Sequence, residues 1–154
     1  WKNVTKDFIK YYKLNNQSSI LDIGCAKGYM LYDFKKHLPR AKVVGIDISK
    51  YAIKNSKTEI KKFLKVGNAK KLKFKDNSFD LVIAINTIHN LNKTECAKAI
   101  KEIVRVNKKN SYIVLDAYNS DLQKKKMLAW NLTGKTIMHK KDWKIFLKKK
   151  HRLD

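Results

Sequence analysis

The residues best suited to chemistry stand around one glycine-containing turn near the start of the chain. Asp22 precedes Gly24 by two residues, and Gly28 follows four residues later. Glycine adopts backbone angles that side chains exclude, and it lets a ligand approach bare backbone. A helix that begins near Gly28 directs its free N–H groups and the positive end of its dipole at the same turn. Backbone donors and one negative charge therefore converge there, and this convergence predicts a ligand site.

A second acid lies where a nucleoside ligand would need one. Asp47 is 19 residues beyond Gly28, at the end of an apolar run. In a strand-helix-strand unit, this offset places a carboxylate on the hydroxyl groups of a ribose. The negative charge also suits a cationic ligand. Asp47 could instead cap the following helix, but Ser49 fills that role well, so we favour the ribose interpretation.

The spacing of the glycines separates two cofactor classes. Dinucleotide-binding turns read G-x-G-x-x-G, whereas this turn reads Gly24-x-Ala26-x-Gly28, one residue shorter, with an acid before it. The shortened acidic form resembles motif I of the class I S-adenosylmethionine-dependent methyltransferases, whose signature is an acid followed by three alternating glycines. Ala26 replaces the middle glycine, which would tighten the loop. The resemblance implies S-adenosyl-L-methionine as the cofactor and disfavours a nicotinamide-dependent oxidoreductase.

Alternating strands and helices are expected to position these residues. Apolar runs predict strands at residues 20–23, 42–49, 64–67, 81–86 and 111–115. Helical spacing, Pro39 and a capping box predict helices at residues 29–38, at 49–63 and from 92–95 onward. This alternation predicts an α/β fold, a Rossmann-like doubly wound parallel sheet with helices on both faces. In such a sheet the ligand lies at the carboxyl ends of the strands, where the candidate residues fall.

The resemblance to class I methyltransferases covers roughly residues 18–118. In that family the corner after the third strand holds Gly-Asp-Ala, whose acid accepts a hydrogen bond from adenine; Asn68 offers an amide oxygen for the same bond. The Asp-Asn-Ser-Phe-Asp run at 76–80 resembles the small-molecule methyltransferases most closely. The predicted cofactor-binding residues are Asp22, Gly24, Cys25, Ala26, Gly28, Asp47, Ile48, Asn68, Ala69 and Asn86. No metal site is predicted.

Methyl transfer from a sulfonium is an in-line displacement that depends mainly on alignment, which can supply about 7–11 kcal/mol. His89, just beyond the fourth predicted strand, is the candidate base for a hydroxyl, carboxyl or amine acceptor. It could equally line the cofactor pocket or hydrogen-bond the backbone, and both interpretations stay open. The run at 86–89 lacks the prolines of enzymes that methylate base amino groups, and neither cysteine is placed to attack cytosine. We therefore expect transfer to an oxygen or nitrogen of a small-molecule acceptor.

The charge of the chain raises the alternative of a nucleic-acid partner. The net charge is +23, but only three of the 36 basic residues are arginine, and the chain is also rich in Asn and Ile. An AT-rich genome produces this composition on any solvated surface, whereas nucleic-acid readers use more arginine. Nucleic acid is therefore not the favoured partner. An RNA methyltransferase, or a non-catalytic protein of this fold that binds nucleic acid or a partner protein through its lysines, remains an alternative.

The length of 154 residues fits one domain. We expect an amphipathic lead-in helix within residues 1–17, the cofactor-binding core at 18–118 and a helical part at 119–154. The resembled fold closes with an antiparallel pair of strands that this chain does not reach, so either a C-terminal part is missing or the sheet ends at five strands. The sequence has no apolar run of about 18 residues and no signal-peptide pattern, so we expect a cytoplasmic protein without membrane contact.

Overall fold

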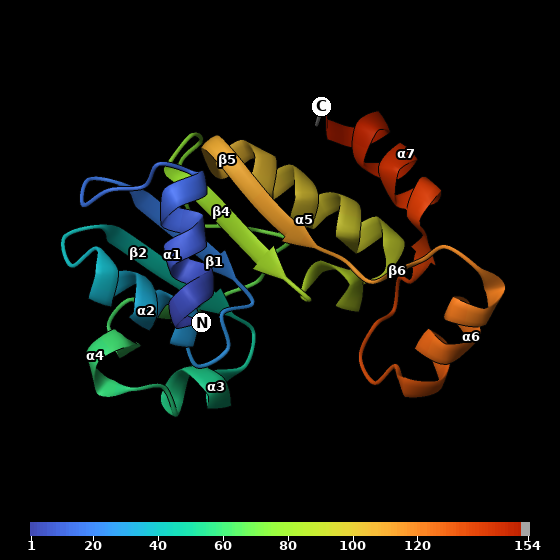
Figure 1. The fold of residues 1–154 in the computed structure, drawn as a ribbon, viewed down its shortest axis with the longest axis horizontal. Helices are drawn as coiled ribbons and strands as arrows, with labels where there is room; N and C mark the ends of the chain where they lie inside the picture. The colour runs from blue at the N-terminus through green and yellow to red at the C-terminus, as the bar shows by residue number, and fades with distance from the viewer. Residues whose placement is uncertain (152–154) are drawn as a thin grey trace.

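The computed structural model describes residues 1–151 and contains a five-stranded, wholly parallel sheet with the order β3-β2-β1-β4-β5 (Figure 1). The strands are β1 (Ser19–Ile23), β2 (Lys42–Asp47), β3 (Leu64–Val66), β4 (Phe79–Ile85) and β5 (Asn107–Val114). The helices are α1 (Lys2–Tyr11), α2 (Tyr29–His37), α3 (Lys50–Lys54), α4 (Thr58–Lys61), α5 (Lys93–Val106), α6 (Asp121–Trp130) and α7 (Lys140–His151), with a 3₁₀ turn, η1 (Ile88–Asn90). The Rossmann-like fold expected from the sequence is confirmed.

Helices cover the sheet on both faces, as Figure 1 shows for α1 in front and α5 behind. On one face, Phe8 of α1 and Phe34 of α2 pack in a cluster with Ile20 and Ile83. On the other face, α5 packs against β4 and β5, α7 packs against α5, and Ile100 of α5 is fully buried there. Central strands buried on both faces need apolar side chains at successive positions, which explains the apolar run at residues 81–85 of β4.

The register brings the carboxyl ends of the strands to one edge. Ile23 of β1 pairs with Ile46 of β2, and Ile85 of β4 pairs with Val114 of β5. The chain passes from β1 to β2 on one side, whereas β4 pairs with β1 on the other. The topological switch point, where ligands of such sheets bind, therefore lies between β1 and β4.

The single helix predicted at 49–63 is wrong, because this stretch forms the two short helices α3 and α4. The side-chain amide of Asn55 donates to the carbonyl of Tyr51, and the Ser56 hydroxyl donates to the carbonyl of Ile53. Such local bonds compete with the helical ladder and end α3. Ile60 of α4 is the buried apolar side chain of this stretch.

The strand predicted at 111–115 begins earlier than expected, because β5 starts at Asn107, directly after α5. The helical part predicted at 119–154 contains α6 and α7, while residues 152–154 lie outside the described part. Between these helices runs β7 (Met138–His139), which pairs in parallel with β6 (Ala117–Tyr118). Within residues 1–151 the main sheet ends at β5, and no antiparallel pair closes it.

The lead-in helix is confirmed as α1, which packs against α2 and carries buried Thr5 and Phe8. None of the helices in residues 1–151 combines the length and the apolar character needed to cross a membrane.

Candidate functional site

Two cavities meet at the carboxyl edge of the sheet, and Gly24, Ile85 and Asn86 line both of them. Cavity A has a volume of about 440 Å³ and is also lined by Asp47, Ile48, Asn68, Ala69, Thr87, Asn90, Leu91 and Lys135. Cavity B has a volume of about 240 Å³ and is also lined by Trp1, Asp22, Cys25, Ala26, Tyr29 and Met30. Together the two cavities contact every predicted cofactor-binding residue except Gly28. Their roles in binding remain a prediction.

The glycine turn is shaped by close packing against two other strands. Gly24 has φ +76°, and a Cβ there would come within 2.0 Å of the Thr87 hydroxyl oxygen beyond β4. Gly28 has φ +72°, and a Cβ there would lie 2.7 Å from a methyl group of Leu64 in β3. Gly24 therefore keeps the turn close to the end of β4, whereas Gly28 allows the start of α2 to pack against β3.

Asp47 ties the glycine turn to β2. One carboxylate oxygen accepts a hydrogen bond from the backbone N–H of Ala26 at 2.8 Å, and the other accepts from the N–H of Ser49 at 2.8 Å. Ser49, not Asp47, caps α3, because its hydroxyl accepts from the N–H of Ala52. Each Asp47 oxygen keeps a second lone pair, so the carboxylate is oriented by the backbone and can still accept from a ligand in cavity A. Ala26 has φ +47°, a conformation that costs a non-glycine residue energy.

Asp22 is the most perturbed acid of the site. The residue is only 3% exposed, lines cavity B and has no hydrogen-bond partner for its carboxylate among residues 1–151. Burial, together with the nearby carboxylate of Asp47, raises the pKa of Asp22 to about 7. A buried carboxylate without a partner is costly, and a cationic ligand would relieve this cost. The rings of Trp1 and Tyr29 line the same cavity, and aromatic faces also attract cations.

Asn68 supports the predicted corner for adenine. Its side-chain oxygen accepts from the backbone N–H of Lys70 at 3.0 Å, which orients the amide and leaves a second lone pair on that oxygen. Asn68 and Ala69 lie together in the wall of cavity A, opposite the end of β4.

The two cysteines are unsuited to nucleophilic attack. Burial and the neighbouring carboxylate of Asp22 raise the pKa of the Cys25 thiol. The Cys96 thiol is fully buried, donates to the carbonyls of Ile88 and Leu91, and also has a pKa raised by burial. Because the thiolate is the reactive form, neither side chain is activated. Within residues 1–151, no group of three or more His, Cys, Asp or Glu side chains is arranged to hold a metal ion.

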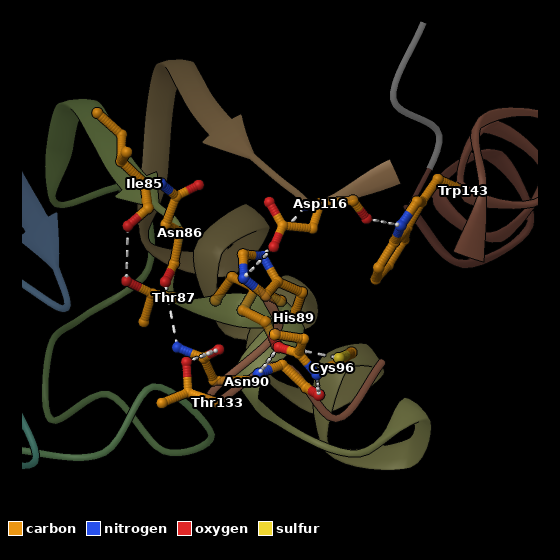
Figure 2. Close-up of polar contacts among 12 residues, drawn as sticks. Ile85, Asn86, Thr87, His89, Asn90, Cys96, Asp116, Thr133 and Trp143 are labelled. Atoms are coloured by element: carbon orange, nitrogen blue, oxygen red, sulfur yellow. Dashed lines mark hydrogen bonds and ion pairs between the residues drawn. The ribbon is translucent and has the colours of Figure 1, made fainter. Parts of the chain in front are cut away.

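His89 is buried, and Asp116 engages both nitrogens of its ring (Figure 2). Nδ1 accepts from the backbone N–H of Asp116 at 3.2 Å, and Nε2 lies 3.3 Å from a carboxylate oxygen of Asp116. Since Nδ1 accepts, the proton of the neutral ring is on Nε2. Burial lowers the pKa of His89. The side chain of His89 lines neither cavity. Of the two interpretations of His89 from the sequence, this geometry favours a hydrogen bond to the backbone over a general base.

The backbone of His89 joins the C-terminal part to the site. Its carbonyl accepts from the N–H groups of Lys135 and Thr136, both at 2.9 Å. Lys135 is thereby brought to the wall of cavity A. Lys135 and Trp1 line the cavities but are not among the residues predicted from the sequence. They reach the site only through contacts between distant segments, and no local motif marks them.

The sheet order defines a Rossmann-like fold, and two cavities lie at its switch point. The crystal structure of the YcgJ protein from Bacillus subtilis is similar, with a TM-score of 0.76 and 18% identity over 97% of this chain and 68% of that chain. This likeness shows the fold.

The family is shown by sequence comparison. Residues 14–151 match the model of the methyltransferase domain family. An uncharacterized methyltransferase of Schizosaccharomyces pombe is 27% identical over 117 residues, which are 68% of this chain and 41% of that protein. The malonyl-acyl-carrier-protein O-methyltransferase of Legionella pneumophila is 28% identical over 116 residues, which are 73% of this chain and 40% of that protein. The chain thus spans about two fifths of the length of these two relatives. It belongs to the methyltransferase domain family, which confirms its resemblance to class I S-adenosylmethionine-dependent methyltransferases.

Proposed function

We propose that this chain binds S-adenosyl-L-methionine and transfers its methyl group to an oxygen or nitrogen of a small-molecule acceptor. The observation that carries the proposal is the buried, unpartnered carboxylate of Asp22 in cavity B, beside the glycine turn. A ligand with a positively charged end accounts for this carboxylate, and a ligand with a nucleoside end accounts for Asp47 and Asn68 in cavity A.

Each part of the site has a proposed task. Asp47 accepts from the ribose hydroxyls, with Ile48, Asn68 and Ala69 around the adenine. Asp22 and the backbone at residues 24–26 hold the methionine part in cavity B. When bound, S-adenosylmethionine supplies a methyl group activated by its sulfonium. The chain's contribution is to align the acceptor and exclude water, which can supply about 7–11 kcal/mol.

An RNA methyltransferase remains the second candidate, for one specific reason. A third cavity of about 640 Å³ adjoins cavity A through Ile48 and Asn68, and four lysines line it: Lys65, Lys70, Lys71 and Lys73. Lysines around an apolar cavity suit a phosphate backbone and an unstacked base. A non-catalytic protein of this fold would use the same lysines without binding the cofactor.

The test is calorimetric titration with S-adenosylhomocysteine, the product form of the cofactor. We expect micromolar binding by the wild-type chain and its loss in Asp47→Ala. Asp76→Ala removes an exposed carboxylate outside both cavities and is expected to bind like the wild type. If the folded wild-type chain does not bind, the cofactor proposal is rejected and the lysine-lined cavity becomes the site to examine with RNA.

A further inference from the structure

The third cavity, here called cavity C, has a lining that the proposed cofactor site leaves largely unused. It has a volume of about 640 Å³, which is within the range of small-ligand pockets. The ends of β2 and β3 form one wall, and the segment at residues 70–74 forms the other. Cavities A and C share four lining residues: Ile46, Ile48, Gly67 and Asn68. A ligand in cavity C would therefore lie beside the proposed nucleoside site.

The wall at residues 70–74 is held in place by α5, although it belongs to no helix or strand. Glu102 accepts a hydrogen bond from the backbone N–H of Leu72 at 2.6 Å. Arg105 donates to the carbonyls of Leu72 and Phe74, at 2.9 and 2.8 Å. Two further hydrogen bonds, of 2.7 and 2.9 Å, join the guanidinium of Arg105 to the carboxylate of Glu102. Because these bonds satisfy the backbone of the wall, the shape of cavity C does not depend on a ligand.

The surface inside cavity C is largely apolar and partly open to water. Ile46 and Leu72 are buried, and the half-buried ring of Phe74 lies beside them in the lining. Val66 is 50% exposed and Ile48 is 74% exposed. Covering such branched side chains with an apolar group removes them from water, which favours binding. The lining therefore suits a ligand with an apolar body.

The charges in this lining are all positive. Lys65 belongs to the β3 wall, whereas Lys70, Lys71 and Lys73 belong to the opposite wall, and no Asp or Glu is among the described lining residues. Lys70 forms an ion pair with Glu95. Among the described residues, the other three lysines have no ion-pair partner. Because lysines are common over this whole surface, the charge is informative only in combination with the apolar cavity that these lysines surround.

We propose that cavity C binds an organic anion, a compact apolar body that carries a phosphate or carboxylate group. The apolar body covers Ile48 and Val66, and the anionic group pairs with the lysines of the two walls. This site is separate from the cofactor site, and the two ligands bind side by side. The inference does not depend on the proposed function, because none of the charged residues of cavity C lines cavity A or cavity B.

A single small anion accounts for cavity C better than an RNA strand does. Binding of a single strand uses a basic groove that follows the backbone and several aromatic faces on which successive bases stack. The described lining has one aromatic residue, Phe74, whose ring packs edge to face against Phe79 at 5.0 Å. The nearby guanidinium of Arg105 is engaged with the wall itself and is not free to contact bases.

The test is a fluorescence titration with anilinonaphthalene sulfonate, an aromatic anion whose emission rises in apolar sites. We expect saturable binding of one dye molecule per chain. The double variant Lys71→Gln/Lys73→Gln should weaken binding about tenfold, because two opposite charges are lost from the lining. The control Lys125→Gln/Lys126→Gln makes the same charge change on exposed positions of α6 and should bind the dye like the wild type.

Displacement of the dye identifies the part of the ligand that is recognised. Naphthyl phosphate, naphthoate and naphthol share one apolar body and differ in the attached group, while inorganic phosphate has the charge without the body. Naphthyl phosphate and naphthoate should displace the dye, and the better of the two shows which anionic group the site prefers. Naphthol and inorganic phosphate should need concentrations at least about tenfold higher.

Titration with S-adenosylhomocysteine separates this inference from the proposed function. All variants should bind it like the wild type, and a saturating concentration should leave the dye bound. The inference is overturned if the wild type binds no dye, if Lys71→Gln/Lys73→Gln binds dye as tightly as the wild type, or if naphthol displaces the dye as well as naphthyl phosphate does. Displacement by S-adenosylhomocysteine would assign the dye to the cofactor site and would also overturn it. A short single-stranded RNA that displaces the dye and binds more tightly than naphthyl phosphate would assign cavity C to RNA instead. Failure of the wild type to bind S-adenosylhomocysteine while it binds the dye rejects the proposed function and supports this inference.

Discussion

The buried carboxylate of Asp22 should make cofactor affinity depend on pH. Its pKa is about 7, because burial and the Asp47 carboxylate both disfavour the charged form. The positive end of the cofactor binds the ionised form, so binding below pH 7 must displace a proton. From pH 8 to pH 6 the ionised fraction falls from about nine tenths to about one eleventh, which predicts a roughly tenfold loss of affinity, or about 1.4 kcal/mol.

The assay is calorimetric titration with S-adenosylhomocysteine at pH 6, 7 and 8, in two buffers with different ionisation enthalpies. At pH 6 we expect about 0.9 proton released per molecule bound, and at pH 8 about 0.1. Asp22→Asn removes the titrating group and should bind weakly with little pH dependence. A wild-type affinity that is constant over this range, or an Asp22→Asn variant that keeps the full pH dependence, would refute the reasoning.

Three further predictions concern stability, each measured by urea unfolding. Because the pKa of Asp22 is raised, the folded state holds an extra proton between about pH 4 and 7. The stability of the wild type relative to Asp22→Asn should therefore fall by up to about 4 kcal/mol as pH rises through this window, and stay constant above it. A stability difference that does not change with pH would contradict this. Ala26→Gly should raise the free energy of unfolding by about 0.5 kcal/mol, because relief of the φ +47° conformation outweighs the added freedom of the unfolded chain; a loss would show that Ala26 is not strained. His89→Phe should lower the free energy of unfolding by about 1–3 kcal/mol, because the backbone N–H and the carboxylate of Asp116 each lose the ring nitrogen that they contact. An unchanged free energy of unfolding would show that the contact between His89 and Asp116 does not stabilise the fold.

The local structural features that the sequence predicts correctly follow from backbone geometry and short-range contacts. The glycine turn is recognisable because positive φ angles at Gly24 and Gly28 favour one residue type. Asn92 and Glu95 form the expected capping box at the start of α5. Asp80, the last residue of the Asp-Asn-Ser-Phe-Asp run, accepts from the backbone N–H and hydroxyl of Ser19 and so joins β4 to β1. Each of these patterns involves residues whose identity follows from backbone geometry or from a neighbour in the fold.

The wrong predictions arise where hydrogen bonds override the structure that the spacing of apolar residues indicates. The apolar spacing of residues 49–63 suits one helix, but local hydrogen bonds from Asn55 and Ser56 end it after Lys54. The strand predicted from residue 111 begins at Asn107, because the residues directly after α5 also pair with β4. In both places, interactions that a periodicity window does not weigh decide the structure.

The sequence alone determined the class of fold and the family, because the alternation of strands and helices and the spacing of the glycine turn are local patterns of the chain. It also predicts the residues that would contact a nucleoside, from acids at fixed offsets. Only the tertiary structure decided the state of Asp22, the partners of His89 and the place of Asp116. The burial of Asp22 and the contact between His89 and Asp116, which are 27 residues apart, depend on how the chain packs. The spacing of residues along the sequence does not predict this packing.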